Sequence, residues 1–253
     1  MSNNRCILLF SGGSDSCLAA LRLAEEYEQV VLLTMTRKGF TKLENVQAQV
    51  ARLDRYFGVS GRFPLHFLPH DRIFRFLLYE NYFSNLRKYG SMLLSHCGLC
   101  KVAMHWRGMV WALENGITHI ADGAVRSSSE YPAQNEKIML KHLRDVYSSF
   151  DLRYENPVYE EPSTEQILYD LRFHRRLDFK RTPDDLQLLC DQQILYAMFM
   201  RHFRTRYSLE EFEDRMVGLY DSKLDMVERM TREYRERGAD SKLAPLLEQE
   251  VTI

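Results

Sequence analysis

The chain has 253 residues, of which 45% are hydrophobic and 27% are charged, a mixture that supports a folded globular core. Its formal net charge of -1 argues against a uniformly basic nucleic-acid-binding surface, although it allows a local basic patch. No apolar run approaches the roughly 18 residues needed to span a bilayer, and no signal-peptide pattern opens the chain. We therefore expect a cytoplasmic protein without a membrane partner. The five cysteines are an odd number, which in a reducing compartment favours metal binding or thiol chemistry over a disulfide framework.

Strand-like and helix-like segments alternate through roughly the first 160 residues. The expected strands are Cys6–Phe10, Val30–Thr36, Pro64–Leu68 and Ile117–Gly123. The expected helices are Ser16–Tyr27, Leu43–Phe57 with a stop at Gly58, Ile73–Leu86 and Cys100–Asn115. This alternation predicts βαβ units and hence an α/β fold with a parallel sheet and right-handed crossovers.

The second half of the chain has a different pattern. The segment S-T-E-Q at 163–166 predicts a capping box that opens a helix through about Leu177. From Asp184 onward the pattern is amphipathic helix with many charges. We therefore place a boundary near residue 180, between a first domain at 1–180 and a helical C-terminal region at 181–253.

The segment F-S-G-G-S-D-S at 10–16 joins the first expected strand to the first expected helix. A helix start presents unpaired N–H groups and the positive end of the helix dipole, and glycines allow the backbone to approach an anion closely. The three serines can donate hydrogen bonds to phosphate oxygens, whereas Asp15 fits beside a phosphate if it binds Mg²⁺ or caps the helix. Turn chemistry alone leaves open an ordinary N-cap with no ligand. The dinucleotide fingerprint G-x-G-x-x-G and the phosphate loop G-x-x-x-x-G-K-S/T are both missing.

The S-G-G-S-D-S segment at 11–16 resembles the S-G-G-x-D-S signature of the PP-loop ATP pyrophosphatases, an adenine nucleotide alpha-hydrolase-like superfamily. The resemblance implies a HUP-type, Rossmann-like parallel sheet with helices on both faces, here extended by C-terminal helices. It also implies that the chain binds MgATP, releases pyrophosphate and leaves AMP on a substrate oxygen. The residues that would bind the nucleotide are Ser11, Gly12, Gly13, Asp15 and Ser16 at the pyrophosphate, Thr34 with its neighbours near adenine, and Gly123 at a strand end.

A second segment, S-H-C-G-L-C-K at 95–101, places Cys97 and Cys100 in a C-x-x-C just before a helix. The residues alone allow four interpretations. They are a redox dithiol, half of a zinc site, ligands of an iron–sulfur cluster, or two cysteines buried by chance.

This segment, followed by A-L-E-N-G-I-T-H-I-A-D-G, resembles the iron–sulfur tRNA-thiolating branch of the same superfamily. In that branch the C-x-x-C and a distant third cysteine bind a [4Fe–4S] cluster and leave one iron open to accept sulfide. The resemblance implies that Cys97, Cys100 and Cys190 are the ligands, while Cys6 and Cys17 are packed in the core. The loop S-E-Y-P at 129–132 instead resembles the 7-cyano-7-deazaguanine synthase branch, whose C-terminal cysteine cluster is missing here.

The resemblance implies adenylation of a carbonyl oxygen followed by sulfur insertion, with Asp15, Cys97 and Cys100 as catalytic residues. The acceptor would be tRNA or a small carbonyl-bearing molecule, a separate sulfur donor would be needed, and a homodimer fits the pattern. Two alternatives stay open. One is amidation or ligation at the same ATP site, as in 7-cyano-7-deazaguanine synthase or lysidine synthase, with zinc or no metal. The other is a non-catalytic ATP-binding partner protein.

Basic residues interleaved with aromatic ones form two clusters in the second half of the chain. Such clusters can grip phosphates and stack bases, although a solvated helix face has the same composition. The members are Arg172, Arg175, Arg176, Lys180 and Arg181 in the first cluster, and Arg201, His202, Arg204 and Arg206 in the second.

Overall fold

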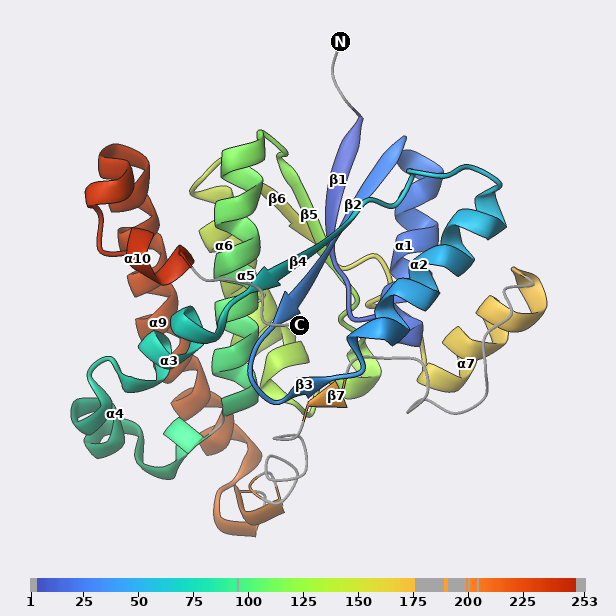
Figure 1. The fold of residues 1–253 in the computed structure, drawn as a ribbon. Helices are drawn as coiled ribbons and strands as arrows, with labels where there is room; N and C mark the ends of the chain where they lie inside the picture. Colours follow the sequence, from blue (N-terminus) through green and yellow to red (C-terminus); the bar gives the residue numbers. More distant parts are fainter. Residues whose placement is uncertain are drawn as a thin grey trace.

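A five-stranded sheet forms the centre of the molecule in the computed structural model, which describes residues 4–94, 96–175, 189–190, 199, 201–203 and 205–248 (Figure 1). The strand order is β4-β2-β1-β5-β6, and every neighbouring pair is parallel. The predicted α/β class with a parallel sheet is therefore confirmed. The strands are β1 (Arg5–Leu9), β2 (Gln29–Thr36), β4 (Leu65–Pro69), β5 (His119–Asp122) and β6 (Arg153–Glu155).

Helices cover both faces of this sheet, as predicted (Figure 1). One face carries α1 (Ser14–Glu26), α2 (Leu43–Phe57) and α7 (Thr164–Tyr169). The other carries α3 (Asp71–Tyr79), α5 (His96–Asn115), α6 (Lys141–Ser148) and α9 (Leu209–Arg237), with α4 (Tyr82–Tyr89) and α10 (Ala244–Leu247) at its margin. Across the described part of the chain, no helix combines the length and the apolar character that a membrane crossing requires.

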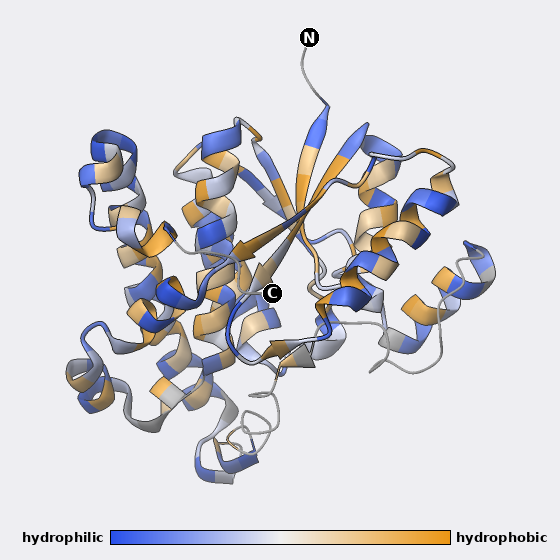
Figure 2. Cartoon of the chain, viewed as in Figure 1, coloured by the Kyte–Doolittle hydropathy of each residue, from blue (hydrophilic) through white to orange (hydrophobic). Residues whose placement is uncertain are grey.

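The core lies in two layers because successive side chains of a strand point to opposite faces of the sheet. In β1, Cys6 and Leu8 pack with α1 and α2, while Ile7 packs with α5 and α9. Figure 2 shows hydrophobic residues concentrated along β2 and β4, between the helical layers. Cys6 and Cys17 are completely buried in the α1 layer, so their predicted packing role is confirmed.

The predicted single helix over 73–86 is wrong, because the chain turns between α3 and α4. Asn81 lies in the left-handed region with a φ of 58°, a conformation that asparagine tolerates better than most residues. The carbonyl of Glu80 accepts hydrogen bonds from Lys223 Nζ at 3.0 Å and from Asn85 Nδ2 at 3.2 Å. These two donors replace the helical partner that the carbonyl would have in a continuous helix.

The predicted helix over 43–57 is confirmed, including its end at Gly58, whereas α1 and α5 begin earlier than predicted. Ser163 caps α7, since its Oγ accepts a hydrogen bond from Gln166 N at 3.2 Å, but α7 gives way to a π-helix over Asp170–His174. The C-terminal helix α9 shares one hydrophobic core with the sheet through Met216, Leu219 and Tyr220. The boundary near residue 180 lies outside the described residues and stays a prediction.

A short antiparallel ribbon, which the sequence did not predict, joins two distant segments. In it, β3 (Phe40–Thr41) pairs with β7 (Leu189–Cys190), and Phe40 is opposite Cys190. The loop that follows β2 therefore holds Cys190 beside the carboxyl end of the sheet.

Candidate active site

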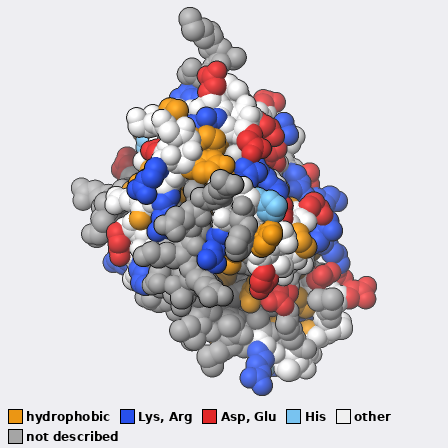
Figure 3. Space-filling view, turned by 90° about the vertical axis from the view of Figure 1, so that its right-hand side faces the viewer, with side chains coloured by type: hydrophobic (Ala, Val, Ile, Leu, Met, Phe, Trp, Pro, Cys, Tyr) orange, Lys and Arg blue, Asp and Glu red, His pale blue; other side chains and the backbone are white. Residues whose placement is uncertain are grey.

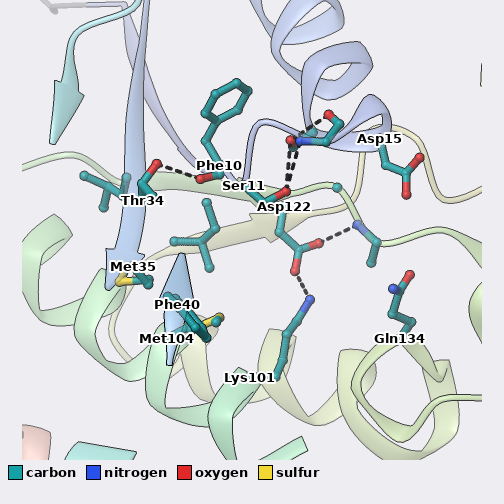
Figure 4. A pocket seen from close by; sticks show the side chains of 16 residues that line it. Phe10, Ser11, Asp15, Thr34, Met35, Phe40, Lys101, Met104, Asp122 and Gln134 are labelled. Carbon is teal, nitrogen blue, oxygen red and sulfur yellow. Dashed lines mark hydrogen bonds and ion pairs between the residues drawn. The ribbon is translucent and has the colours of Figure 1, made fainter. Parts of the chain in front are cut away.

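The carboxyl ends of β1, β2 and β5 border a cavity of about 280 Å³ (Figure 4). Open α/β sheets bind ligands where the helical connections of two neighbouring strands lie on opposite faces of the sheet. Here β1 is followed by α1 on one face, and its neighbour β5 is preceded by α5 on the other face. The volume is slightly below the roughly 300–1,000 Å³ of small-molecule sites, so it suits part of a nucleotide. The lining residues are Leu9, Phe10, Ser11, Gly13, Asp15, Ser16, Leu33, Thr34, Met35, Phe40, Lys101, Met104, Asp122, Gly123, Ala124 and Gln134.

The loop between β1 and α1 is held in shape by its own hydroxyl groups. Gly12 has a φ of 78°, which favours glycine. The backbone N–H of Gly13 donates to Ser11 Oγ at 3.3 Å, and Ser16 Oγ donates to the Gly13 carbonyl at 3.0 Å. The first helical hydrogen bond runs from Cys17 N to the Gly13 carbonyl at 2.9 Å, so the N–H groups of residues 14–16 have no helical partner. Such a loop end is a ready anion site.

Gly123 allows β5 to lie directly against this loop. A Cβ at Gly123 would lie 2.9 Å from the backbone nitrogen of Ser16 and 3.1 Å from the carbonyl carbon of Asp15. Backbone atoms cannot rotate away as a side-chain tip can, so any larger residue here would displace the first turn of α1. The predicted site residue Gly123 therefore lies beside the predicted loop.

Asp15 and Thr34 both line the cavity, but in different ways. Burial raises the pKa of the Asp15 carboxyl, which accepts a hydrogen bond from Ser14 Oγ at 3.0 Å. A nearby cation would favour its charged form. The Thr34 hydroxyl donates to the Phe10 carbonyl at 2.7 Å, so its hydrogen is engaged with β1, and Thr34 shapes the cavity wall.

A buried polar network at the base of the cavity was missed by the sequence analysis. Its centre is Asp122, a residue that is 3% exposed and whose carboxylate forms an ion pair with Lys101. Among the described residues that line the cavity, Lys101 is the only basic one. The other donors to the carboxylate are His105 Nε2 at 3.1 Å, Tyr154 Oη at 3.0 Å, Asn156 Nδ2 at 2.6 Å and the Ala124 N–H at 3.0 Å.

These contacts fix the charge state of the network. Burial would raise the pKa of Asp122, but the Lys101 charge and the His105 hydrogen bond outweigh it and hold the pKa well below its usual range. Burial lowers the pKa of His105, whose Nδ1 lies 2.9 Å from Tyr147 Oη. A neutral imidazole that donates from Nε2 to Asp122 and accepts at Nδ1 from Tyr147 satisfies this geometry. Lys101 is thereby held with its ammonium at the cavity (Figure 4).

The predicted cysteines form a second group of side chains next to the cavity. Cys97 and Cys100 lie in the first turns of α5, and Arg37 Nη2 donates to Cys190 Sγ at 3.5 Å. The Arg37 guanidinium carbon lies 5.0 Å from the Phe40 ring centroid and 4.6 Å from that of Phe74. Phe40 lines the cavity and pairs with Cys190, so Cys190 lies beside a residue of the cavity wall.

The thiols lie in a largely buried environment. Burial raises the pKa of both Cys97 and Cys100 to about 12, and the electrostatic effect of Cys190 raises both further while that of Arg37 lowers them. Arg37 donates to Cys190 Sγ and also hydrogen-bonds to Cys100, so these two thiols share one arginine. His70 is completely buried, its Nε2 lies 3.4 Å from Cys100 Sγ, and burial lowers its pKa to about 3.

No three Cys, His, Asp or Glu side chains of the described residues are arranged to bind one metal ion. This finding supports neither a zinc ion nor an iron–sulfur cluster at the described cysteines, so both metal assignments stay predictions.

Arg175, a described member of the first basic cluster, is used in ion pairs. Arg175 pairs with Glu25 at 2.7 Å and with Asp170 at 3.1 Å. Figure 3 shows basic and acidic side chains interspersed over the described residues of one face of the molecule. Arg176, Lys180, Arg181 and Arg204 lie outside the described residues, so the predicted phosphate-binding role of these clusters stays a prediction.

Among three comparisons with known proteins, only the comparison with solved structures found similar chains. No model of a known protein family matches the chain, and no curated protein matches it. One similar solved structure is a predicted subunit of tRNA methyltransferase from Methanocaldococcus jannaschii, with 16% identity, a TM-score of 0.41, and coverage of 65% of this chain and 73% of that one. Another is NMN synthetase from Francisella tularensis, with 11% identity, a TM-score of 0.41, and coverage of 89% and 87%.

Proposed function

We propose that the chain binds MgATP in the cavity and transfers AMP to a substrate oxygen with release of pyrophosphate. The observation that carries this proposal is the S-G-G-S-D-S loop, whose unpaired N–H groups border the cavity that Lys101 and Asp15 also line. Two carboxylates, Asp15 and Asp122, face one ammonium there. A polyphosphate therefore needs a divalent cation, and Asp15 is the residue suited to bind Mg²⁺ because Asp122 is already saturated with donors.

In this reaction a carbonyl oxygen of the acceptor attacks the α-phosphorus of ATP, the bond to the bridging oxygen breaks, and pyrophosphate leaves with that electron pair. The loop N–H groups hold the departing phosphates, and Lys101 stabilises negative charge that develops at the α-phosphate. The network around Asp122 contributes by fixing the position of Lys101.

The binding step is tested by titrating the protein with ATP in the presence of Mg²⁺ and then with EDTA. We expect tighter binding with Mg²⁺, and loss of that gain in Asp15→Asn. Asp145→Asn, on an exposed position of α6, is the matched control and should bind like wild type. Equal affinity of Asp15→Asn and wild type would contradict the role of Asp15.

The reaction type is tested by chromatography of the nucleotide products, with bulk tRNA as the acceptor probe. AMP and pyrophosphate are the expected products. Formation of ADP and phosphate would refute the proposal, because it requires attack at the γ-phosphorus.

A sulfur-transfer second step is supported by Arg37, which hydrogen-bonds to both Cys190 and Cys100, and by α5, whose first turns hold Cys97 and Cys100. A [4Fe–4S] cluster on these three thiolates would supply a site for inorganic sulfide. Without a cluster, the terminal sulfur of a persulfide on Cys97 or Cys100 would attack the activated carbon, and AMP would leave with the oxygen. A neighbouring thiolate would then attack the cysteine-bound sulfur, release the thiolated product and leave a disulfide for an external thiol to reduce.

Iron and acid-labile sulfide in protein purified without oxygen separate these routes. About four irons per chain are expected if a cluster binds. Cys190→Ala should lose them, whereas Cys6→Ala, which removes a cysteine from the other side of the sheet, should keep them. A protein that stays iron-free after reconstitution would exclude the cluster route. If it also forms no persulfide with a sulfane-sulfur donor such as polysulfide, amidation or ligation at the same ATP site becomes the better hypothesis.

A further inference from the structure

The corner between α3 and α4 exposes an aromatic cluster that the proposed chemistry does not use (Figure 1). Phe83 is 84% exposed and Tyr79 is 61% exposed, the two highest values among the described large hydrophobic residues. Tyr82 lies between them, with ring centroids 6.2 Å from Tyr79 and 5.7 Å from Phe83. Together with Asn81 and Ser84, the three rings line an open hollow. Flat rings beside amide and hydroxyl groups suit a planar polar ligand that both stacks and forms hydrogen bonds.

The backbone of this corner is fixed. Lys223, only 1% exposed, donates to the Glu80 carbonyl at 3.0 Å, and Asn85 donates to the same oxygen at 3.2 Å. A fixed turn lowers the entropy cost of ordering the rings when a ligand binds.

Each exposed ring has an arginine one helical turn away. Arg75 precedes Tyr79 by four residues in α3, and Arg87 follows Phe83 by four residues in α4, so each pair shares a helix face. Both arginines are exposed, and neither forms an ion pair with any described residue. Residues 72–88 contain four basic residues and a single acidic one, Glu80. Elsewhere in the described chain, the exposed arginines Arg126, Arg153, Arg215, Arg232 and Arg237 have acidic partners, whereas Arg55, Arg229 and Arg235 form no ion pair with a described residue.

We propose that this aromatic–arginine surface, formed by Arg75, Tyr79, Tyr82, Phe83 and Arg87, binds an unpaired base of single-stranded RNA. The base stacks on the exposed rings, and the arginines hold the flanking phosphates. A second copy of the chain fits less well, because a two-fold contact places the same basic residues opposite one another. The inference rests on the proposed function, which supplies the reason for the chain to bind RNA. The surface is connected to the cysteines along the chain, because the short helix Gly90–Leu94 joins α4 to the first turn of α5.

The test is fluorescence anisotropy with a labelled single-stranded RNA 12-mer and its duplex, without ATP, over a range of salt concentrations. Wild type should bind the single strand more tightly than the duplex. Tyr79→Ala with Phe83→Ala should weaken binding at least about fivefold, the effect of losing one stacked base. Arg75→Gln with Arg87→Gln should reduce the slope of log K against log salt by about 1.4, from two lost phosphate contacts. Tyr56→Ala, an exposed ring on α2, is the matched control and should leave binding unchanged.

Equal RNA binding by the aromatic variant, or equal binding of single strand and duplex, would overturn the inference. It would also be overturned if the aromatic variant dissociated a dimer in sedimentation without affecting RNA. Melting curves guard against misfolding, which is not expected at such exposed positions. Wild type that binds the RNA at this surface but releases no pyrophosphate from ATP would refute the proposed function and leave this surface intact.

Discussion

Replacing Asp122 with asparagine should destabilise the chain because it removes the carboxylate that forms the buried ion pair with Lys101. Asparagine keeps one acceptor oxygen, which can still serve Asn156 Nδ2 and the Ala124 N–H. His105 can change tautomer and Tyr154 can rotate its hydroxyl, so these donors find other partners. The Lys101 ammonium cannot adapt. Breaking a buried ion pair costs roughly 3–5 kcal/mol. The Lys101 side chain is 16% exposed and reaches the cavity, so we expect about 3 kcal/mol.

The decisive comparison is a double-mutant cycle with Lys101→Met. In the double variant neither charge is left without a partner. Its loss of unfolding free energy should therefore be smaller, by about 1–3 kcal/mol, than the summed losses of the two single variants. Urea unfolding at pH 7, followed by both circular dichroism and tryptophan fluorescence, measures these free energies and checks for a two-state transition. The pair Arg126–Glu160 is a matched control, since its side chains are 63% and 71% exposed. Its cycle should give less than about 1 kcal/mol.

Additive losses at Asp122 and Lys101, within about 0.5 kcal/mol, would refute this reasoning. They would mean that the two side chains do not interact in solution, and that Lys101 is not positioned by the network.

Three further predictions use the same regions. Gly123→Ala should lower the affinity for MgATP at least about tenfold, because the added Cβ would displace the first turn of α1. Gly218→Ala in α9 is the control. Unchanged affinity in Gly123→Ala would contradict an anion site at the start of α1. The folded pKa of Asp122 is depressed, so its contribution to stability is present above the unfolded pKa of about 3.9 and is lost as pH falls below it. Between pH 5 and 3 the unfolding free energy of wild type should fall more steeply than that of Asp122→Asn. Parallel curves of unfolding free energy against pH would contradict an ionised Asp122 carboxylate. Asn81→Gly should stabilise the chain by up to about 1 kcal/mol while Asn81→Ala destabilises it, since the φ angle of residue 81 is positive. A higher melting temperature for Asn81→Ala than for Asn81→Gly would contradict the left-handed conformation of this residue.

The strands and the phosphate-type loop could be predicted because their signals are local. Apolar runs of strand length, followed by the glycine pair, specify β1 and the start of α1 without reference to the rest of the chain. The α3–α4 turn was missed because apolar residues continue at helical spacing on both sides of Asn81. Only the polar pair Glu80-Asn81 marked the break.

The network around Asp122 could not be predicted, because its members come from α5, β5 and β6 and follow no periodic pattern. Two signals were nevertheless present in the sequence. Asp122 is an acidic residue at the end of an apolar strand, and Lys101 directly follows the C-x-x-C. A buried charge in each of these positions needs an oppositely charged partner. The parallel pairing of β5 with β1 places Asp122 at the carboxyl end of the sheet, where Lys101 reaches it.

Helix geometry explains how one segment can face both the cavity and the thiols. Neighbouring residues of an α-helix point about 100° apart, so Cys100 faces His70 while Lys101, next in sequence, faces the cavity. Phe40 lines the cavity and pairs with Cys190. In the proposed sulfur transfer, the acceptor would therefore lie beside the first turns of α5, with its oxygen toward Lys101 and its carbon toward the thiols.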